Sequence, residues 1–237
     1  MTNPFFSFKH FTIRQEDAPL KVTTDSCMLG AYASAISPTH ILDIGTGTGI
    51  LAIMAAQRFR EAYIDGIEAD MVAAEQARKN AQTCPWTSRI KIKTVRIQDY
   101  LKKQRKIYDL ILCNPPYHES QFPSRDNRKN LAKHSIGMSL PELAHAVDQL
   151  ISSVGNFYSI TPPESFGILD KELSFYGFRT FDRLLIYNLP SKPLYRIIGG
   201  FSKVKKREKE NELQIMDKEG NYTIGFRKLL TDFYLAF

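Results

Sequence analysis

Hydrophobic and polar positions along the chain follow two different periods, and each change of period predicts the end of one element and the start of the next. Short apolar runs predict strands, whereas longer segments with one apolar face predict helices. The predicted strands cover residues 41–44, 63–67, 90–97, 108–113, 157–161, 179–187 and 195–203, and the predicted helices cover residues 50–59, 71–81, 140–151 and 166–176. This alternation favours an α/β fold, in which a parallel sheet carries helices on both faces.

The segments at either end of this pattern predict smaller additions to the sheet. In residues 1–25 aromatic and polar residues alternate, which indicates short strands. Asp25 is a candidate N-cap for a helix that ends at Ala35. Residues 213–237 predict a hairpin, with its turn at residues 218–221, and then a short helix.

The candidate ligand site lies where three of the predicted strands end. Parallel sheets of this type bind ligands beyond the carboxyl ends of their strands. An unusual sequence follows Ile44, Ile67 and Cys113, the last residues of the first, second and fourth predicted strands. We therefore expect these three sequences to meet at one edge of the sheet.

The first of them is rich in glycine and begins a helix. Gly45, Gly47 and Gly49 allow a tight turn and a close approach of the backbone to a ligand. The dinucleotide fingerprint would require a further glycine or alanine at the position of Ile50, so the match to that fingerprint fails. The carboxylate of Asp43 would repel a pyrophosphate and attract an ammonium group.

Two further carboxylates extend this site. Glu68 ends the second predicted strand, where it can accept hydrogen bonds from both hydroxyls of a ribose. Asp99, after the third strand, can accept from the amino group of an adenine. A ligand with an ammonium group, a ribose and no phosphate fits S-adenosylmethionine. The plain alternative is that the glycines only make a turn and that Glu68 is a solvated strand end.

The third sequence is Asn114-Pro115-Pro116-Tyr117. The two prolines stiffen the backbone and leave carbonyl oxygens without competing N–H donors. With the side-chain carbonyl of Asn114 they form a cluster of acceptors that suits a planar NH₂ group, and the ring of Tyr117 can stack on a flat base or amide. Methyl transfer to such a nitrogen is an in-line displacement that depends mainly on positioning. The alternative is a turn that is only structural.

Together these motifs resemble those of the class I S-adenosylmethionine-dependent methyltransferases that act on exocyclic amino or amide nitrogens. Within that superfamily the chain is most similar to the bacterial tRNA (adenine-N6)-methyltransferases, which modify the adenosine 3′ of the anticodon, position 37, in a valine tRNA. The resemblance implies a Rossmann-like sheet of seven strands, one of them antiparallel. It is supported by residues 8–11, by residues 21–26, which resemble a segment closing over the methionine end of the cofactor, and by residues 128–134 on the substrate side.

The resemblance also assigns roles to individual residues. Thr23 stands where the family pattern has a glycine. Catalysis is assigned to Asn114, Pro115, Pro116 and Tyr117. The expected contacts with S-adenosylmethionine come from Lys21, Thr24, Asp25, Asp43, Gly45, Thr46, Gly47, Gly49, Glu68, Asp99 and Asn114. The expected contacts with tRNA come from Arg125, Arg128, Lys129 and Lys133.

Composition and charge agree with an anionic partner. The 237 residues include 32 Lys and Arg against 25 Asp and Glu, a net charge of +7 that favours nucleic acid. We expect one domain over residues 1–237, with an extension at residues 1–38 and a catalytic core at residues 39–205. The three cysteines form no C-x-x-C motif, so no metal site is expected. Neither a signal peptide nor an apolar run of about 20 residues is present, so a cytoplasmic protein with no membrane partner is expected. A monomer is a separate expectation.

Several alternatives remain open at this point. A protein glutamine amide is also a planar NH₂ group, although enzymes that act on it typically carry a helical domain before the Gly-rich strand. Guanine N2 of ribosomal RNA would need similar chemistry. A non-catalytic RNA-binding protein with this fold is disfavoured by the intact Asn114 and Tyr117, and a nicotinamide dehydrogenase by Asp43 and Ile50.

Overall fold

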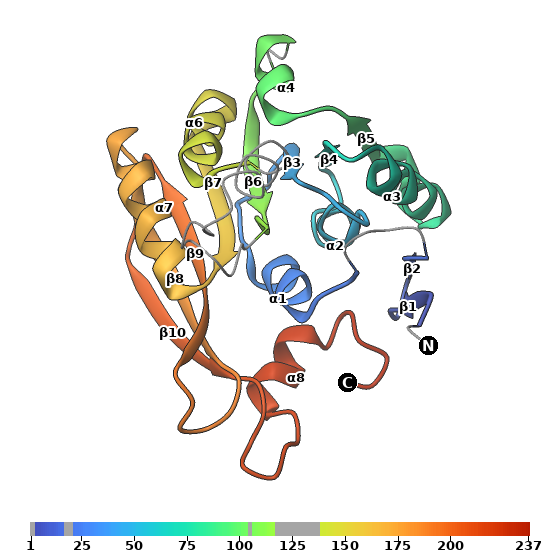
Figure 1. Cartoon of the computed structure of the whole chain (residues 1–237), viewed down its shortest axis with the longest axis vertical. Helices are drawn as coiled ribbons and strands as arrows, with labels where there is room; N and C mark the ends of the chain where they lie inside the picture. The colour runs from blue at the N-terminus through green and yellow to red at the C-terminus, as the bar shows by residue number, and fades with distance from the viewer. Residues whose placement is uncertain (1–2, 17–20, 104–105, 117–137) are drawn as a thin grey trace, which may run out of the picture.

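The computed structural model describes residues 3–16, 21–103, 106–116 and 138–237, and a large mixed sheet lies at its centre (Figure 1). In this part of the chain the sheet has eight strands in the order β10-β8-β9-β7-β6-β3-β4-β5. All neighbours are parallel except where β9 pairs with β7 and β8. The strands are β3 (His40–Ile44), β4 (Tyr63–Glu68), β5 (Ile90–Thr94), β6 (Tyr108–Cys113), β7 (Ile151–Thr161), β8 (Arg179–Tyr187), β9 (Leu194–Ser202) and β10 (Lys209–Gln214).

Helices cover both faces of the sheet, as the alternating sequence predicts (Figure 1). One face carries α1 (Thr24–Tyr32), α2 (Ile50–Arg58) and α3 (Met71–Thr83), with α8 (Ile224–Leu230) packed against α1. The other face carries α4 (Ile97–Lys103), α6 (Leu140–Leu150) and α7 (Pro163–Phe175). A short 3₁₀ helix, η1 (Thr87–Arg89), directly precedes β5 in the chain. Successive strand residues point to opposite faces, so Ile41 packs in one core and Leu42 in the other.

A small hairpin and the C-terminal segment pack together beside α1 and α2. β1 (Phe5–Ser7) and β2 (Thr12–Arg14) form an antiparallel pair, and Phe8 forms a β-bridge with Tyr234. The ammonium of Lys9 donates to the carbonyl oxygens of Thr231, at 2.5 Å, and Phe237, at 2.6 Å. The two segments therefore form one aromatic and hydrogen-bonded unit, although more than 200 residues separate them in sequence.

The predicted fold class is confirmed, and the predicted elements differ from the observed ones mainly at their ends. β6 and β8 have the predicted bounds, but the predicted strand over residues 90–97 is wrong at its end, because β5 stops at Thr94 and Ile97 begins α4. The predicted N-cap at Asp25 is also wrong. The side chain of Thr23 accepts from the backbone N–H of Ser26 and caps α1, which ends at Tyr32 rather than Ala35.

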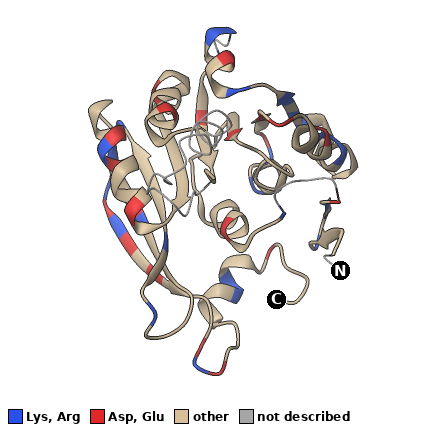
Figure 2. Ribbon diagram, in the orientation of Figure 1, with Lys and Arg blue, Asp and Glu red and all other residues tan. Residues whose placement is uncertain are grey.

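The eighth strand, β10, was not predicted. It lies at the edge of the sheet and pairs in parallel with β8. Its sequence, KENELQ, is dominated by charged and polar residues, and Figure 2 shows both signs of charge along it. The predicted C-terminal hairpin is present after β10: Met216 bridges Tyr222, Gly220 adopts a φ of +83°, and α8 follows.

The helices of the described segments are too short and too polar to cross a membrane.

Candidate active site

The three unusual sequences lie at one edge of the sheet because the strands before them are neighbours. β3 pairs in parallel with β4 on one side and with β6 on the other. Ile44 is opposite both Ile67 and Cys113 in the register. The Gly-rich turn after β3, Glu68 at the end of β4 and Asn114 after β6 therefore share the carboxyl edge, where parallel sheets bind ligands.

The Gly-rich turn depends on three glycines in a left-handed conformation. Gly45, Gly47 and Gly49 have φ angles of +71°, +54° and +84°, which side chains other than glycine rarely adopt. A Cβ atom at Gly45 or Gly47 would meet no described atom within 4 Å, whereas one at Gly49 would lie 3.3 Å from Cβ of Ala77. The first two glycines thus leave open space at the turn, and the third allows close packing of α3 against it.

Asp43 is the buried carboxylate beneath this turn. Its Oδ2 atom accepts from the hydroxyl of Thr46, at 2.5 Å, and from the backbone N–H of Ala52, at 3.2 Å. Its Oδ1 atom is buried and has no hydrogen-bond partner among the described residues. Burial raises the pKa of Asp43 to about 7, and the charge of Glu68 contributes in the same direction. An unsatisfied buried acceptor of this kind fits a cationic or hydrogen-bond-donating ligand group.

Glu68 ties the Gly-rich turn to β4. Its Oε2 atom accepts from the backbone N–H of Gly47, at 2.9 Å, and its Oε1 atom accepts from the N–H of Asp70, at 3.0 Å. Each carboxylate oxygen can accept more than one hydrogen bond, so these contacts leave capacity for hydroxyl donors. Glu68 therefore shapes the turn in addition to the ligand-binding role expected from the sequence.

Asp99 follows the third predicted strand and lies in the first turn of α4. Its side chain is exposed and forms an ion pair with Lys102, with 2.9 Å between Oδ1 and Nζ. The hydrogen bond and the positive charge of Lys102 lower the pKa of Asp99 below its usual range. The structure thus gives this carboxylate a lysine partner on its own helix.

Asn114 is joined to the first turn of α1. It directly follows β6, and its Nδ2 atom donates to the hydroxyl oxygen of Ser26 at 2.9 Å. Pro115 is buried and Pro116 is exposed. The other predicted substrate-side residues, which are Tyr117, Arg125, Arg128, Lys129 and Lys133, lie outside the described residues.

The expected cofactor ligands before α1 and in its first turn differ in their exposure. Lys21 and Thr24 are exposed. Asp25 is buried, and its Oδ2 atom accepts from Nε of Arg196 at 2.7 Å. The sequence analysis missed Ser26 and Arg196, because nothing near either residue in sequence indicates its distant partner.

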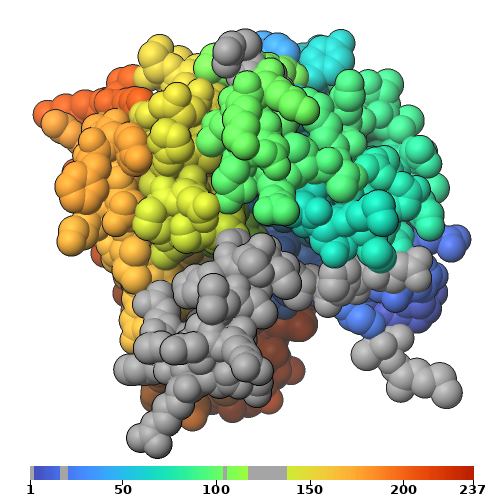
Figure 3. Space-filling view, turned by 45° about the horizontal axis from the view of Figure 1, so that its top comes forward, coloured from blue at the N-terminus to red at the C-terminus, as the bar shows by residue number. Residues whose placement is uncertain are grey.

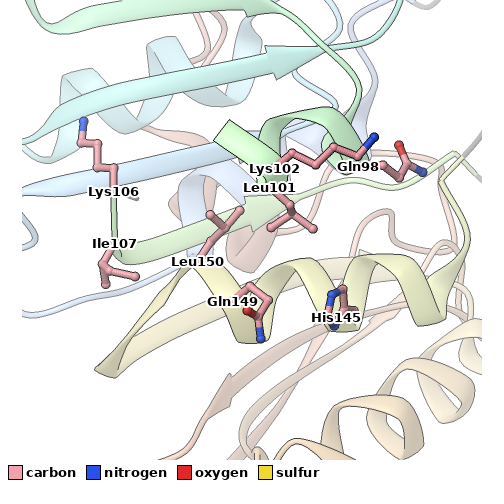
Figure 4. Close-up of a pocket in the computed structure, with 8 residues that line it drawn as sticks. All are labelled: Gln98, Leu101, Lys102, Lys106, Ile107, His145, Gln149 and Leu150. Carbon is pink, nitrogen blue, oxygen red and sulfur yellow. The ribbon is translucent and has the colours of Figure 1, made fainter. Parts of the chain in front are cut away.

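A separate groove lies between α4 and α6, which lie side by side on the surface (Figures 3 and 4). It extends to Ile107, just before the amino end of β6, whereas Asn114 follows the carboxyl end. Its two lysines are already engaged, Lys102 with Asp99 and Lys106 with Asp65. The groove has a volume of about 610 Å³ and is lined by Gln98, Leu101, Lys102, Lys106, Ile107, His145, Gln149 and Leu150.

Comparisons with known proteins identify the family. Residues 27–138 match the family model of the methyltransferase small domain. The tRNA1(Val) (adenine(37)-N6)-methyltransferase of Dyadobacter fermentans is 34% identical over 239 residues, covering 99% of both chains. The enzyme of the same name from Pedobacter heparinus is 37% identical over 232 residues, covering 98% of both chains. The chain belongs to this methyltransferase family.

A solved structure extends the comparison to the fold. A predicted O-methyltransferase from Agrobacterium tumefaciens superposes with a TM-score of 0.68, covering 88% of this chain and 96% of that chain. Its sequence identity is 17%, so the likeness concerns the fold alone. In this family member the described residues contain no cluster of three or more His, Cys, Asp or Glu side chains that could hold a metal ion.

Proposed function

We propose that the protein transfers a methyl group from S-adenosylmethionine to the exocyclic N6 amine of adenosine 37 in a valine tRNA. The position of Asn114 supports this activity most directly. Its amide lies at the sheet edge that also carries the Gly-rich turn, so a bound amine and a bound cofactor would meet there. The full-length similarity to relatives with this named activity supports the same substrate.

The acceptor groups at Asn114 suit a planar amine. The carbonyl oxygens of Asn114 and Pro115 would accept its two hydrogens, which turns the nitrogen lone pair towards the methyl group. No strong base is required, because the amine can lose its extra proton after the new bond has formed. The residues around Asn114 therefore act by orienting the nucleophile for in-line attack.

The residues around the Gly-rich turn fit S-adenosylmethionine, which supplies the methyl group as part of a sulfonium. The unsatisfied Oδ1 atom of Asp43 would accept a hydrogen bond from a donor group of the ligand. The open space above Gly45 and Gly47 admits close contact with the backbone, and Glu68 would accept from the ribose hydroxyls. Lys21, before α1, and Thr24, the first residue of α1, would contact the cofactor from this side.

The activity can be tested with tRNA isolated from a strain that lacks the enzyme. We expect the purified protein and isotope-labelled S-adenosylmethionine to produce labelled N6-methyladenosine, detected by mass spectrometry of the digested nucleosides. Cleavage of the tRNA into fragments before digestion should locate the label at position 37. Label in guanosine, or in a glutamine-containing peptide with none in tRNA, would contradict the proposal and favour one of the alternative amines.

The proposed tRNA contacts can be tested separately. Arg125, Arg128, Lys129 and Lys133 follow Asn114 in sequence, so we expect them to contact phosphates beside the target nucleotide. The target base must leave its stack to reach Asn114, which costs a few kcal/mol and must be offset by such contacts. Replacing Arg128, Lys129 and Lys133 with Gln should reduce the slope of log affinity against log salt by up to about two. An unchanged slope with unchanged affinity would exclude these side chains from the interface.

We also propose that the protein acts in the cytoplasm and that it is a monomer.

A further inference from the structure

We propose that Ser26 is a positioning residue, whose hydroxyl fixes the amide of Asn114 so that its oxygen faces the methyl-accepting amine. This role rests on the proposed function, because it concerns the orientation of the same nucleophile. Ser26 belongs to the first turn of α1, whereas Asn114 directly follows β6. Its contact with Asn114 joins residues 88 positions apart in sequence.

The chemical need for such a residue follows from the shape of an amide group. Rotating the Asn114 side chain by half a turn exchanges its oxygen and its NH₂ group with little change of shape. Only one of the two orientations offers an acceptor to the substrate amine, and the other offers a donor that repels it. A fixed partner for the NH₂ group therefore selects the productive orientation before the substrate binds.

Ser26 has the geometry of that partner. Its Oγ atom lies 2.9 Å from Nδ2 of Asn114, and the residue is 8% exposed, so water competes little for the contact. The same Oγ atom lies 3.1 Å from Oγ1 of Thr23. When Ser26 donates its proton to Thr23, the Ser26 oxygen acts as an acceptor towards Asn114, and this arrangement favours the amide orientation with Nδ2 towards Ser26.

The first turn of α1 is held rigidly enough for this selection. Thr23 caps the helix by accepting the backbone N–H of Ser26 at 3.2 Å. Beside it, Asp25 pairs with Arg196 of β9, with both side chains largely buried. The remainder of α1 is fixed on α2, because a guanidinium nitrogen of Arg58 donates to the carbonyl oxygen of Gly30 at 2.8 Å. The Ser26 hydroxyl is thus preorganised at the site.

The test is a double-mutant cycle measured under single-turnover conditions with tRNA and saturating S-adenosylmethionine. Ser26→Ala should reduce the methylation rate by about tenfold, the effect of losing one hydrogen bond to an oriented group. In the Asn114→Ala background the same change should cause no further loss, since its effect passes through Asn114. The dissociation constant of S-adenosylmethionine, measured by calorimetry, should stay the same.

Controls separate this role from a structural one. Ser34→Ala, which removes a hydroxyl contact with Tyr158 just beyond the other end of α1, should leave the rate unchanged. Ser26→Cys keeps a similar shape but accepts hydrogen bonds poorly, so its activity should fall nearly as far as that of Ser26→Ala. This second variant keeps the test valid if the alanine variant folds badly. A wild-type rate in Ser26→Ala, an equal loss in the Asn114→Ala background, or a loss confined to cofactor affinity would each overturn the proposal. An inactive wild-type protein would instead contradict the proposed function.

Discussion

Asn114 and Asp43 show how two single residues contribute differently to one site. Asn114 is half-buried at the sheet edge, with its amide joined to α1. Asp43 is completely buried within β3, beneath the Gly-rich turn. In the proposed function the first residue would act on the substrate amine, and the second on the cofactor.

Asn114→Ala should nearly abolish turnover while the protein still binds S-adenosylmethionine. Removing one preorganised contact to a transition state typically costs about 2.7–4 kcal/mol, or roughly a hundred- to a thousandfold in rate. The rate is measured by incorporation of labelled methyl groups into tRNA, and the affinity by calorimetry. Turnover close to that of the wild type would remove Asn114 from the mechanism.

Asp43 should make the stability of the ligand-free protein depend on pH. Its pKa is about 7 in the folded state against 3.8 for an ordinary aspartate, so between these values the folded protein holds a proton that the unfolded chain has released. Stability is therefore greatest at the acidic end of this window and falls as the pH rises towards 7, by about 1.4 kcal/mol for each unit of raised pKa.

Asp43→Asn provides the comparison, because it keeps the shape and cannot ionise. Urea denaturation between pH 4.5 and 8 should show a flatter pH dependence for this variant than for the wild type. Parallel curves for the two proteins would mean that Asp43 titrates near its ordinary pKa in the folded state.

At the scale of elements, α1 is fixed to the sheet by an ion pair that the sequence does not reveal. Arg196→Ala would leave the buried carboxylate of Asp25 without its guanidinium, and breaking a buried pair in this way typically costs about 3–5 kcal/mol. The free energy of unfolding, measured by urea denaturation, should fall by a substantial part of that amount. Asp25→Asn combined with Arg196→Ala should recover part of the loss.

The matched control is the exposed pair between Lys102 and Asp99 on α4. Lys102→Ala should leave the free energy of unfolding nearly unchanged, because exposed ion pairs are screened by water. Equal losses for Lys102→Ala and Arg196→Ala would contradict a special role for the buried pair.

These elements also mark the limit of prediction from sequence. The carboxyl ends of β3, β4 and β6 could be located because each of the short strands predicted there ends on apolar residues, and the Gly-rich turn, Glu68 and Asn114 stand directly after those residues. Helix α4 was not predicted, and its first residue, Ile97, was assigned to the preceding strand because it continues the apolar pattern of β5 although its backbone is helical. The contacts of Ser26 with Asn114 and of Asp25 with Arg196 span 88 and 171 residues, so only the assembled sheet brings the partners together.

At the scale of the whole molecule, the sheet ends on one side in β10, whose charged residues face no further strand among the described residues. An edge strand with free backbone groups can pair with another chain, and charged side chains oppose that pairing. Replacing both Glu210 and Glu212 with Val should therefore cause association that increases with protein concentration. Sedimentation velocity over a concentration series measures it.

The matched control replaces Glu219, which lies in the exposed turn after β10, with Val. This variant loses a negative charge without altering the edge, so it should sediment as the wild type does. Identical sedimentation of all three proteins would show that the charges on β10 do not limit association.

The composition of β10 has one more consequence. Its lack of apolar alternation is the reason that it does not look like a strand in the sequence. The same property makes it a poor template for a strand from another copy of the protein. The charged residues that hide this strand from a search for apolar alternation therefore also oppose the addition of a further strand at this edge of the sheet.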